Sequence, residues 1–173
     1  MGRATWIISN VHSDRLYKAL PEELKLLYFQ LLTHPNGNKA GYFQIDIDIH
    51  RILRGGRTED ECRKELETDT SLWLYDRTND IVLIPTFLKY NKIGSNKTLQ
   101  SMKFELEQLP ASPLCTEFIY RLNEYTEGKG LDYVPHKMVL QARSYMSEIK
   151  ALNTLTAHDS IIIKLLDSIK NIT

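Results

Sequence analysis

Hydrophobic residues recur at helical spacing in five segments of the chain, and each segment predicts an amphipathic helix. The first begins at Pro21 and ends near His34-Pro35. The second spans about Lys97 to Leu109, with Ser95 as its expected cap. The third begins at Ser112-Pro113. The predicted buried faces are Leu24, Leu27, Tyr28 and Leu31; Leu99, Met102, Leu106 and Leu109; Leu114, Phe118, Leu122 and Tyr125; Met138, Tyr145, Ile149 and Leu152; and Ile162, Leu165, Leu166 and Ile169.

Three shorter runs of aromatic and β-branched residues predict strands. Gly41–Ile45 follows the turn cluster 35–38, and two further runs, Leu72–Tyr75 and Ile81–Ile84, flank a polar loop at 76–80. Turn-forming residues between two apolar runs predict a β-hairpin, and Arg77 lies at its tip.

Between the first strand and the hairpin, the pattern predicts two short helices. The first spans about Ile47 to Leu53, with Asp46 as its cap. Its expected buried residues are Ile49, Ile52 and Leu53. The alternative is a longer strand, in which Ile45, Ile47 and Ile49 alternate with Asp46 and Asp48. Helical spacing fits the apolar positions better, so we favour the helix.

The second short helix follows Gly55-Gly56, where the chain is free to turn. Thr58-Glu-Asp-Glu61 has the pattern of a capping box, which predicts where this helix begins. Its inward face carries Cys62 and Leu66. Its opposite face carries Asp60, Arg63, Lys64 and Glu67.

Strand, helix, turn, helix and hairpin follow one another in the order of a winged helix-turn-helix. The predicted fold is therefore mainly α with a small β-sheet, a winged helix-turn-helix followed by additional C-terminal helices. We expect a winged-helix domain at residues 1–93 and a helical extension at 94–173. The last two amphipathic helices need a cover, either their own domain or a second copy of the chain.

Charge changes this picture only locally. The formal net charge of the 173 residues is zero, so any attraction to nucleic acid must come from a patch. From Thr86 to Lys103 the only charged residues are Lys89, Lys92, Lys97 and Lys103. Four lysines close to a duplex would make binding strongly salt-dependent, whereas the alternative is a solvated helix rim.

Other chemistry has no support in the sequence. The five histidines show no metal-ligand spacing, and neither a phosphate-binding glycine loop nor a nucleophile elbow is present. We therefore expect no enzyme activity, no cofactor and no metal. Cys62 and Cys115 both fall on apolar helix faces, as expected for buried thiols in a reducing compartment. Without a membrane-length apolar run or a signal peptide, we expect a cytoplasmic protein of a bacterial host.

Several stretches together resemble a known family. They are Leu24-Lys-Leu-Leu-Tyr-Phe-Gln-Leu-Leu-Thr33, Ala40-Gly-Tyr-Phe-Gln-Ile45, Thr58-Glu-Asp-Glu61, Phe87-Leu-Lys-Tyr-Asn91, and the stretch from Leu109-Pro-Ala-Ser-Pro-Leu114 to Glu124-Tyr-Thr-Glu-Gly128. Their order and spacing between Thr5 and Gly128 are similar to those of phage replication initiation proteins, or replisome organisers, which are related to DnaD-type primosomal proteins.

The resemblance implies a module that binds double-stranded origin DNA, self-associates, and helps to recruit a host or phage helicase or its loader. It implies that Arg63 and Lys64 probe the groove and that Arg77 lies at the wing. It also implies that Arg51, Arg54, Arg57 and Lys92 hold the DNA backbone. Acidic residues on the same helix, Asp60 and Glu67, can accept from cytosine amino groups but repel phosphate.

Two other functions fit the same pattern. One is a transcriptional regulator of phage genes, which would bind upstream of its own gene. The other is a protein-interaction or oligomerisation module that binds no DNA, which the zero net charge and the two C-terminal amphipathic helices favour.

Overall fold

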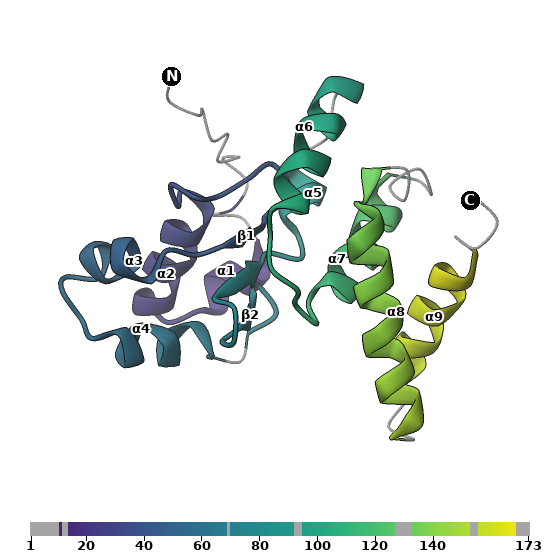
Figure 1. Cartoon of the computed structure of the whole chain (residues 1–173). Coiled ribbons are helices and arrows are strands. Elements are labelled where there is room, and N and C mark those ends of the chain that lie inside the picture. Colours follow the sequence, from purple (N-terminus) through teal and green to yellow (C-terminus); the bar gives the residue numbers. More distant parts are fainter. Residues whose placement is uncertain are drawn as a thin grey trace. The chain divides into compact units, whose positions relative to one another are not determined.

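The computed structural model describes residues 11, 14–68, 70–91, 95–126, 133–152 and 156–168. The chain divides into two compact units, Met1–Ile93 and Gly94–Thr173. It is mainly helical with a small three-stranded antiparallel sheet, as predicted (Figure 1). The first unit holds α1 (Arg15–Ala19), α2 (Glu22–Leu32), β1 (Tyr42–Gln44), α3 (Ile47–Leu53), α4 (Glu59–Leu66), β2 (Leu74–Asp76), β3 (Ile81–Leu83) and α5 (Phe87–Tyr90). The second holds α6 (Asn96–Glu107), α7 (Cys115–Tyr125), α8 (His136–Ala151) and α9 (Ala157–Ser168).

The sheet has the order β1-β3-β2, with β3 in the centre and both pairings antiparallel. Val82 of β3 lies opposite Phe43 of β1 and Tyr75 of β2. These pairs confirm the predicted hairpin and join it to the first strand, from which α3 and α4 separate it in the sequence. All three residues of β3 are buried, as expected for a central strand.

The core of the first unit lies between the helices and one face of the sheet. From α2, Leu27, Tyr28 and Leu31 are buried, which confirms the predicted face of this helix. They belong to one cluster with Phe43 and Val82 of the sheet, together with Leu66 and Trp73. The indole nitrogen of Trp73 donates to the carbonyl of Leu66 at 3.0 Å, so the C-terminal end of α4 is anchored to this core.

The predicted buried face of α3 is wrong, although the helix itself has the predicted bounds. Ile52 is 77% exposed and Leu53 is 43% exposed, whereas Ile47 and His50 are buried. The face that packs inward is therefore set by an Ile47–His50 pair three residues apart. A neutral imidazole is compatible with burial, but a pattern based on hydropathy alone does not select histidine as a buried residue.

Gly41 is required where the chain enters β1. Its φ is +67°, and a Cβ at this position would lie 2.4 Å from the Cβ of Phe87. The carbonyl of Gly41 also accepts from the amide of Ile84 at 2.8 Å, which extends the β1–β3 pairing. A side chain would therefore meet both an unfavourable backbone conformation and a direct clash.

In the second unit, Ser95 caps α6 as predicted, because its side chain accepts from the amide of Thr98. The residues that α6 buries are Leu99, Met102 and Leu106. Lys137 of α8 donates to the carbonyl of Leu109 at 3.0 Å and also to that of Glu107. A cation thus satisfies carbonyls at and just beyond the end of α6, where the helix leaves them without partners.

The last three helices of the second unit pack on one another, so α8 and α9 are covered by their own unit. The predicted face of α8 is only partly right: Met138 is buried and Tyr145 and Ile149 are half-buried, whereas Val139, Ala142 and Met146 are buried without having been predicted. Leu152 is 71% exposed. On α9, Ile162 and Leu166 are buried as predicted, and Ile169 lies outside the described residues. Arg143 of α8 donates to the carbonyl of Leu166 at 3.0 Å.

Both cysteines are free and buried, as the sequence predicts. Burial raises the pKa of the Cys115 thiol to about 12 and also raises the pKa of the Cys62 thiol. Both thiols are therefore protonated and unreactive at neutral pH.

Candidate nucleic-acid interface

The segment that contains α3, the glycine turn and α4 is fixed by local hydrogen bonds. The side chain of Asp46 accepts from the amides of Asp48 and Ile49, which begins α3. Gly55 and Gly56 then have φ values of +74° and +79°, which let the chain turn. These contacts confirm both the predicted cap and the predicted glycine turn.

The predicted capping box then begins α4. The amide of Thr58 donates to the carboxylate of Glu61 at 2.8 Å, and the amide of Glu61 donates to the Thr58 hydroxyl at 3.3 Å. Cys62 and Leu66 are buried as predicted, so the opposite face of α4 points away from the core. This start position decides which residues the outward face carries.

An ion-pair cluster joins α2, α3 and α4, and we call its members, Arg54, Arg57, Glu65 and Gln30, the inner cluster. Its central pair, Arg54 and Glu65, is buried, whereas the Arg57 side chain is 39% exposed. Arg54 donates two hydrogen bonds to the carboxylate of Glu65, at 2.9 and 2.7 Å, and a third to Gln30 at 3.3 Å. Arg57 also donates to Glu65. The Arg54 side chain is only 4% exposed, which leaves it no surface for a DNA phosphate in this arrangement.

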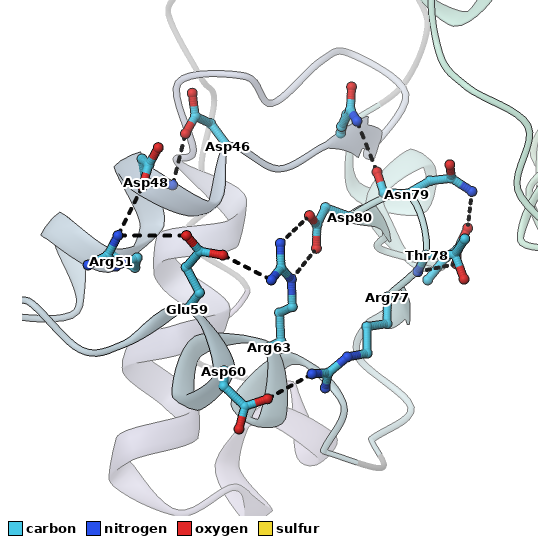
Figure 2. Close-up of polar contacts among 12 residues, drawn as sticks. Asp46, Asp48, Arg51, Glu59, Asp60, Arg63, Arg77, Thr78, Asn79 and Asp80 are labelled. Atoms are coloured by element: carbon cyan, nitrogen blue, oxygen red, sulfur yellow. Dashed lines mark hydrogen bonds and ion pairs between the residues drawn. The ribbon is translucent and has the colours of Figure 1, made fainter.

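Arg63 joins α4 to the hairpin. Its guanidinium donates two parallel hydrogen bonds to the carboxylate of Asp80, at 3.0 and 2.9 Å, and a third to Glu59 at 3.1 Å (Figure 2). The Tyr75 hydroxyl donates to the same Asp80 carboxylate. Partial burial alone would raise the pKa of Asp80, but the bonds from Arg63 and Tyr75 outweigh it and lower that pKa.

A second group of ion pairs lies on the outward face of α4, and we call Asp60, Lys64, Glu67 and Arg77 the outer cluster. Asp60 accepts from Lys64 and from Arg77, each at 2.7 Å, and Arg77 also pairs with Glu67 at 2.9 Å. All four side chains are between 40% and 69% exposed. The hydrogen bond from Lys64, followed in size by the one from Arg77, lowers the pKa of Asp60. The same hydrogen bond to Asp60 raises the pKa of Lys64.

The remaining candidate cations are more scattered. Arg51 pairs with Asp48 at 3.1 Å and reaches Glu59 at 3.9 Å. Lys89 is exposed on α5, with its ammonium 5.3 Å from the centroid of the Tyr90 ring. Lys97 is exposed on α6 in the second unit, and Lys92 lies outside the described residues. The structure thus brings Arg51, Arg63, Lys64 and Arg77 around α4. Because Lys89 and Lys97 belong to different units and Lys92 lies outside the described residues, a shared surface for the lysine run stays a prediction.

Sequence reasoning missed two features of this region. The first is that every candidate cation of α3, α4 and the hairpin has a carboxylate partner within the same unit. Several partners are distant in sequence, such as Asp80 for Arg63, so spacing gave no signal. The i, i+4 spacing of Asp60 and Lys64 was a signal that could have predicted one pair.

The second is a pair of buried histidines. The ring centroids of His34 and His50 lie 6.5 Å apart, and the two residues are 3% and 0% exposed. Among the residues that the structure describes, neither nitrogen of His50 has a hydrogen-bond partner, and the Nε2 of His34 has none. Burial, then the neighbouring His34 and Arg54, lower the pKa of His50 to about 4. Burial likewise lowers the pKa of His34.

Within the described ranges, the structure gathers no group of three or more histidine, cysteine, aspartate or glutamate side chains able to hold a metal ion. None of the helices described is both long and apolar enough to cross a membrane. Comparison with family models, with curated proteins and with solved structures found no match to this chain.

Proposed function

We propose that the first unit is a winged helix-turn-helix module that binds double-stranded DNA through α4 and the β2–β3 hairpin. One observation carries this proposal. The hairpin directly follows the α3–α4 pair, and its tip residue Arg77 is bonded to Asp60 and Glu67 on the outward face of α4. A candidate recognition helix and a candidate wing therefore share one exposed surface.

The order of elements supports the same reading. A strand precedes α3, and this strand pairs with the second strand of the hairpin. Ile47 of α3 and Leu66 of α4 belong to the same core cluster as Val82 of the sheet, so the sheet backs the two helices. In a helix-turn-helix protein the second helix enters the major groove while the first crosses the backbone. On this chain, α4 is the helix whose outward face is polar and exposed.

Burial divides the candidate cations into two roles. Lys64 and Arg77 are 69% and 45% exposed and are placed to contact DNA. Arg54 and Arg63 instead hold α3, α4 and the hairpin together through carboxylates that are mostly buried. The DNA contact surface proposed here is therefore smaller than the list of basic residues suggests.

A fluorescence-anisotropy titration with a labelled duplex of about 20 base pairs tests this proposal, at about 0.05 M and 0.3 M salt. We expect binding at low salt that weakens steeply at high salt, because DNA-bound cations release condensed counterions. The Lys64→Ala/Arg77→Ala variant should bind more weakly than the wild type. Lys18→Ala/Lys39→Ala, which removes two exposed lysines elsewhere in the unit, is the matched control. Absence of binding at the lowest salt, both in the wild type and in a variant with Asp60 and Glu67 changed to the corresponding amides, contradicts the proposal.

We further propose that this DNA binding serves replication initiation in a phage or prophage. The support is the resemblance of residues 5–128 to replisome organisers. Footprinting across the phage genome separates this role from transcriptional regulation. Protection within an origin supports replication, whereas protection upstream of the protein's own gene supports the regulator.

A protein-interaction module is the second candidate function. It is favoured by Ile52 and Leu53, which end α3 with exposed apolar side chains, and by the paired charges of the outward face of α4. Light scattering over a range of concentrations tests it with the wild type and with Ile52→Asp. A wild type that binds no duplex but self-associates, and an Ile52→Asp variant that remains monomeric, would favour this function.

A further inference from the structure

The outer cluster holds its two cations in a shared arrangement. Asp60 lies between Lys64 and Arg77 and accepts from both, while Glu67 takes the other side of the Arg77 guanidinium. Figure 2 shows the Arg77 side chain extending from the hairpin toward Asp60 at the start of α4. Each cation already donates to a carboxylate in this geometry, so a phosphate that takes the same N–H groups must displace that carboxylate.

We propose that Asp60 and Glu67 compete with DNA phosphate for Lys64 and Arg77, and that this competition sets the affinity and the salt dependence of DNA binding. The inference rests on the proposed function and adds a mechanism of regulation to the same surface. Before binding, the two carboxylates occupy the cations. On binding, phosphate oxygens replace them, and the carboxylates become solvated neighbours of the duplex.

The ion pairs of the outer cluster can exchange a carboxylate for a phosphate because their side chains are exposed to water. Ion pairs between side chains in contact with water are weak, because solvent screens the charges and the long side chains lose freedom on pairing. Asp60 and Glu67 are 55% and 40% exposed, so a phosphate can reach the same guanidinium and ammonium groups. Arg63 differs, because its two parallel bonds go to a carboxylate only 21% exposed, which Tyr75 also contacts.

Replacement of the carboxylates by phosphate should change how the affinity for DNA depends on salt concentration. A cation that binds DNA releases condensed counterions, so each phosphate contact steepens the slope of log affinity against log salt by about 0.9. A carboxylate released at the same time attracts cations from solution, which offsets part of that release. The wild type should therefore show a shallower slope than its number of phosphate contacts implies.

The test compares Asp60→Asn/Glu67→Gln with the wild type by anisotropy, with a random-sequence duplex of about 20 base pairs at five salt concentrations. We expect binding about three to ten times tighter at about 0.1 M salt, from the loss of two exposed competing charges. We also expect a slope steeper by about one to two. Adding Arg77→Ala to the same variant should remove most of the gain.

Glu22→Gln/Glu23→Gln is the matched control. It removes two exposed charges from the first turn of α2, where Glu22 pairs only with Lys25 of the same helix among the described contacts. This control should raise affinity less than Asp60→Asn/Glu67→Gln and leave the slope near the wild-type value. Unfolding followed by tryptophan fluorescence checks that each variant is folded, and the single change Asp60→Asn replaces the double variant if that one is not.

The possible outcomes separate the two proposals. A wild type that binds duplex DNA, with an acid-to-amide variant of the same affinity and slope, overturns the competition and leaves the proposed function standing. Binding that appears only in the acid-to-amide variant supports the competition. Absence of binding in both proteins at the lowest salt overturns the proposed function itself.

Discussion

The inner and outer clusters use the same chemistry on the same helix and have different consequences. In each, an arginine from outside α4 pairs with a carboxylate of α4: Arg54 with Glu65 in one, and Arg77 with Asp60 in the other. Arg54 and Glu65 are 4% and 15% exposed, whereas Arg77 and Asp60 are 45% and 55% exposed. Sequence alone, which shows only acids and bases on a short helix, does not distinguish them.

The comparison teaches that burial decides what an ion pair does. Removing one partner of a buried pair leaves the other charge without water or a counterion, which is strongly destabilising. Removing one partner of an exposed pair leaves a charge that water solvates at once. The inner cluster therefore maintains the arrangement of α2, α3 and α4, while the outer cluster is available for exchange with a ligand.

The largest expected loss of stability comes from a substitution that breaks the inner cluster. Glu65→Ala leaves Arg54 buried without its carboxylate, which should reduce the free energy of unfolding of the first unit by about 3–5 kcal/mol. Urea denaturation followed by tryptophan fluorescence measures it, because Trp6 and Trp73, the two tryptophans of the chain, both fall within residues 1–93. Glu22→Ala, which removes a side chain that is 88% exposed, is the control and should leave the urea midpoint nearly unchanged.

The second largest expected effect is a fall in the free energy of unfolding of the same unit at acid pH. The pKa of His50 is lowered to about 4 in the folded protein, below its ordinary value of about 6.5, so the unfolded chain binds the proton more readily. The stability that neutral His50 contributes is present above pH 6.5 and is lost as the pH falls toward 4. We expect the unfolding free energy to fall by about 2 kcal/mol between pH 7 and pH 5.

Urea denaturation at a series of pH values measures this loss. The lowered pKa of His34 acts in the same direction, so both histidines contribute to the slope. His50→Leu removes one titrating group and should make the pH dependence shallower than that of the wild type. An equal pH dependence in the two proteins would show that His50 does not carry the effect.

A smaller effect is expected at the start of α4. Thr58→Ala removes the hydroxyl that accepts from the amide of Glu61, and loss of such a cap costs about 1 kcal/mol. The same urea experiment measures the loss. Thr58→Ser keeps the hydroxyl and should retain most of the stability. A Thr58→Ser variant as unstable as Thr58→Ala would mean that the methyl group, and not the cap, matters.

The smallest effect on stability is expected from the outer cluster. Asp60→Asn/Glu67→Gln should leave the urea midpoint close to that of the wild type, because all four side chains of this cluster are well exposed. Comparison with Glu65→Ala tests the contrast directly. If the outer variant lost as much stability as the inner one, burial would not be the property that separates the clusters.

Features determined by near neighbours in the chain could be predicted from the sequence. The capping box at Thr58, the cap at Asp46 and the Gly55-Gly56 turn depend on residues within three or four positions, and the structure confirms them. The three strands and the pairing of the hairpin followed from short runs of aromatic and β-branched residues flanked by turn residues.

Features determined by tertiary contacts could not be predicted. The inward face of α3 depends on how the helix packs, and packing favoured His50 over Ile52. The partners of the candidate cations lie up to 17 residues away, as Asp80 does from Arg63. No spacing rule shows that a basic residue is already neutralised by a carboxylate from another element. For the same reason, the number of arginines in the sequence overestimates the exposed basic surface of this region.

Gly41 has a consequence for how this chain can vary. A left-handed φ of +67° and a Cβ position 2.4 Å from Phe87 leave no room for any of the other nineteen side chains. In a saturation library selected for folded protein, this codon should therefore return to glycine alone. Gly55 and Gly56, whose missing Cβ atoms would meet nothing within 4 Å, should instead accept asparagine or aspartate. Gly41 should therefore be invariant among the selected variants, whereas Gly55 and Gly56 should vary.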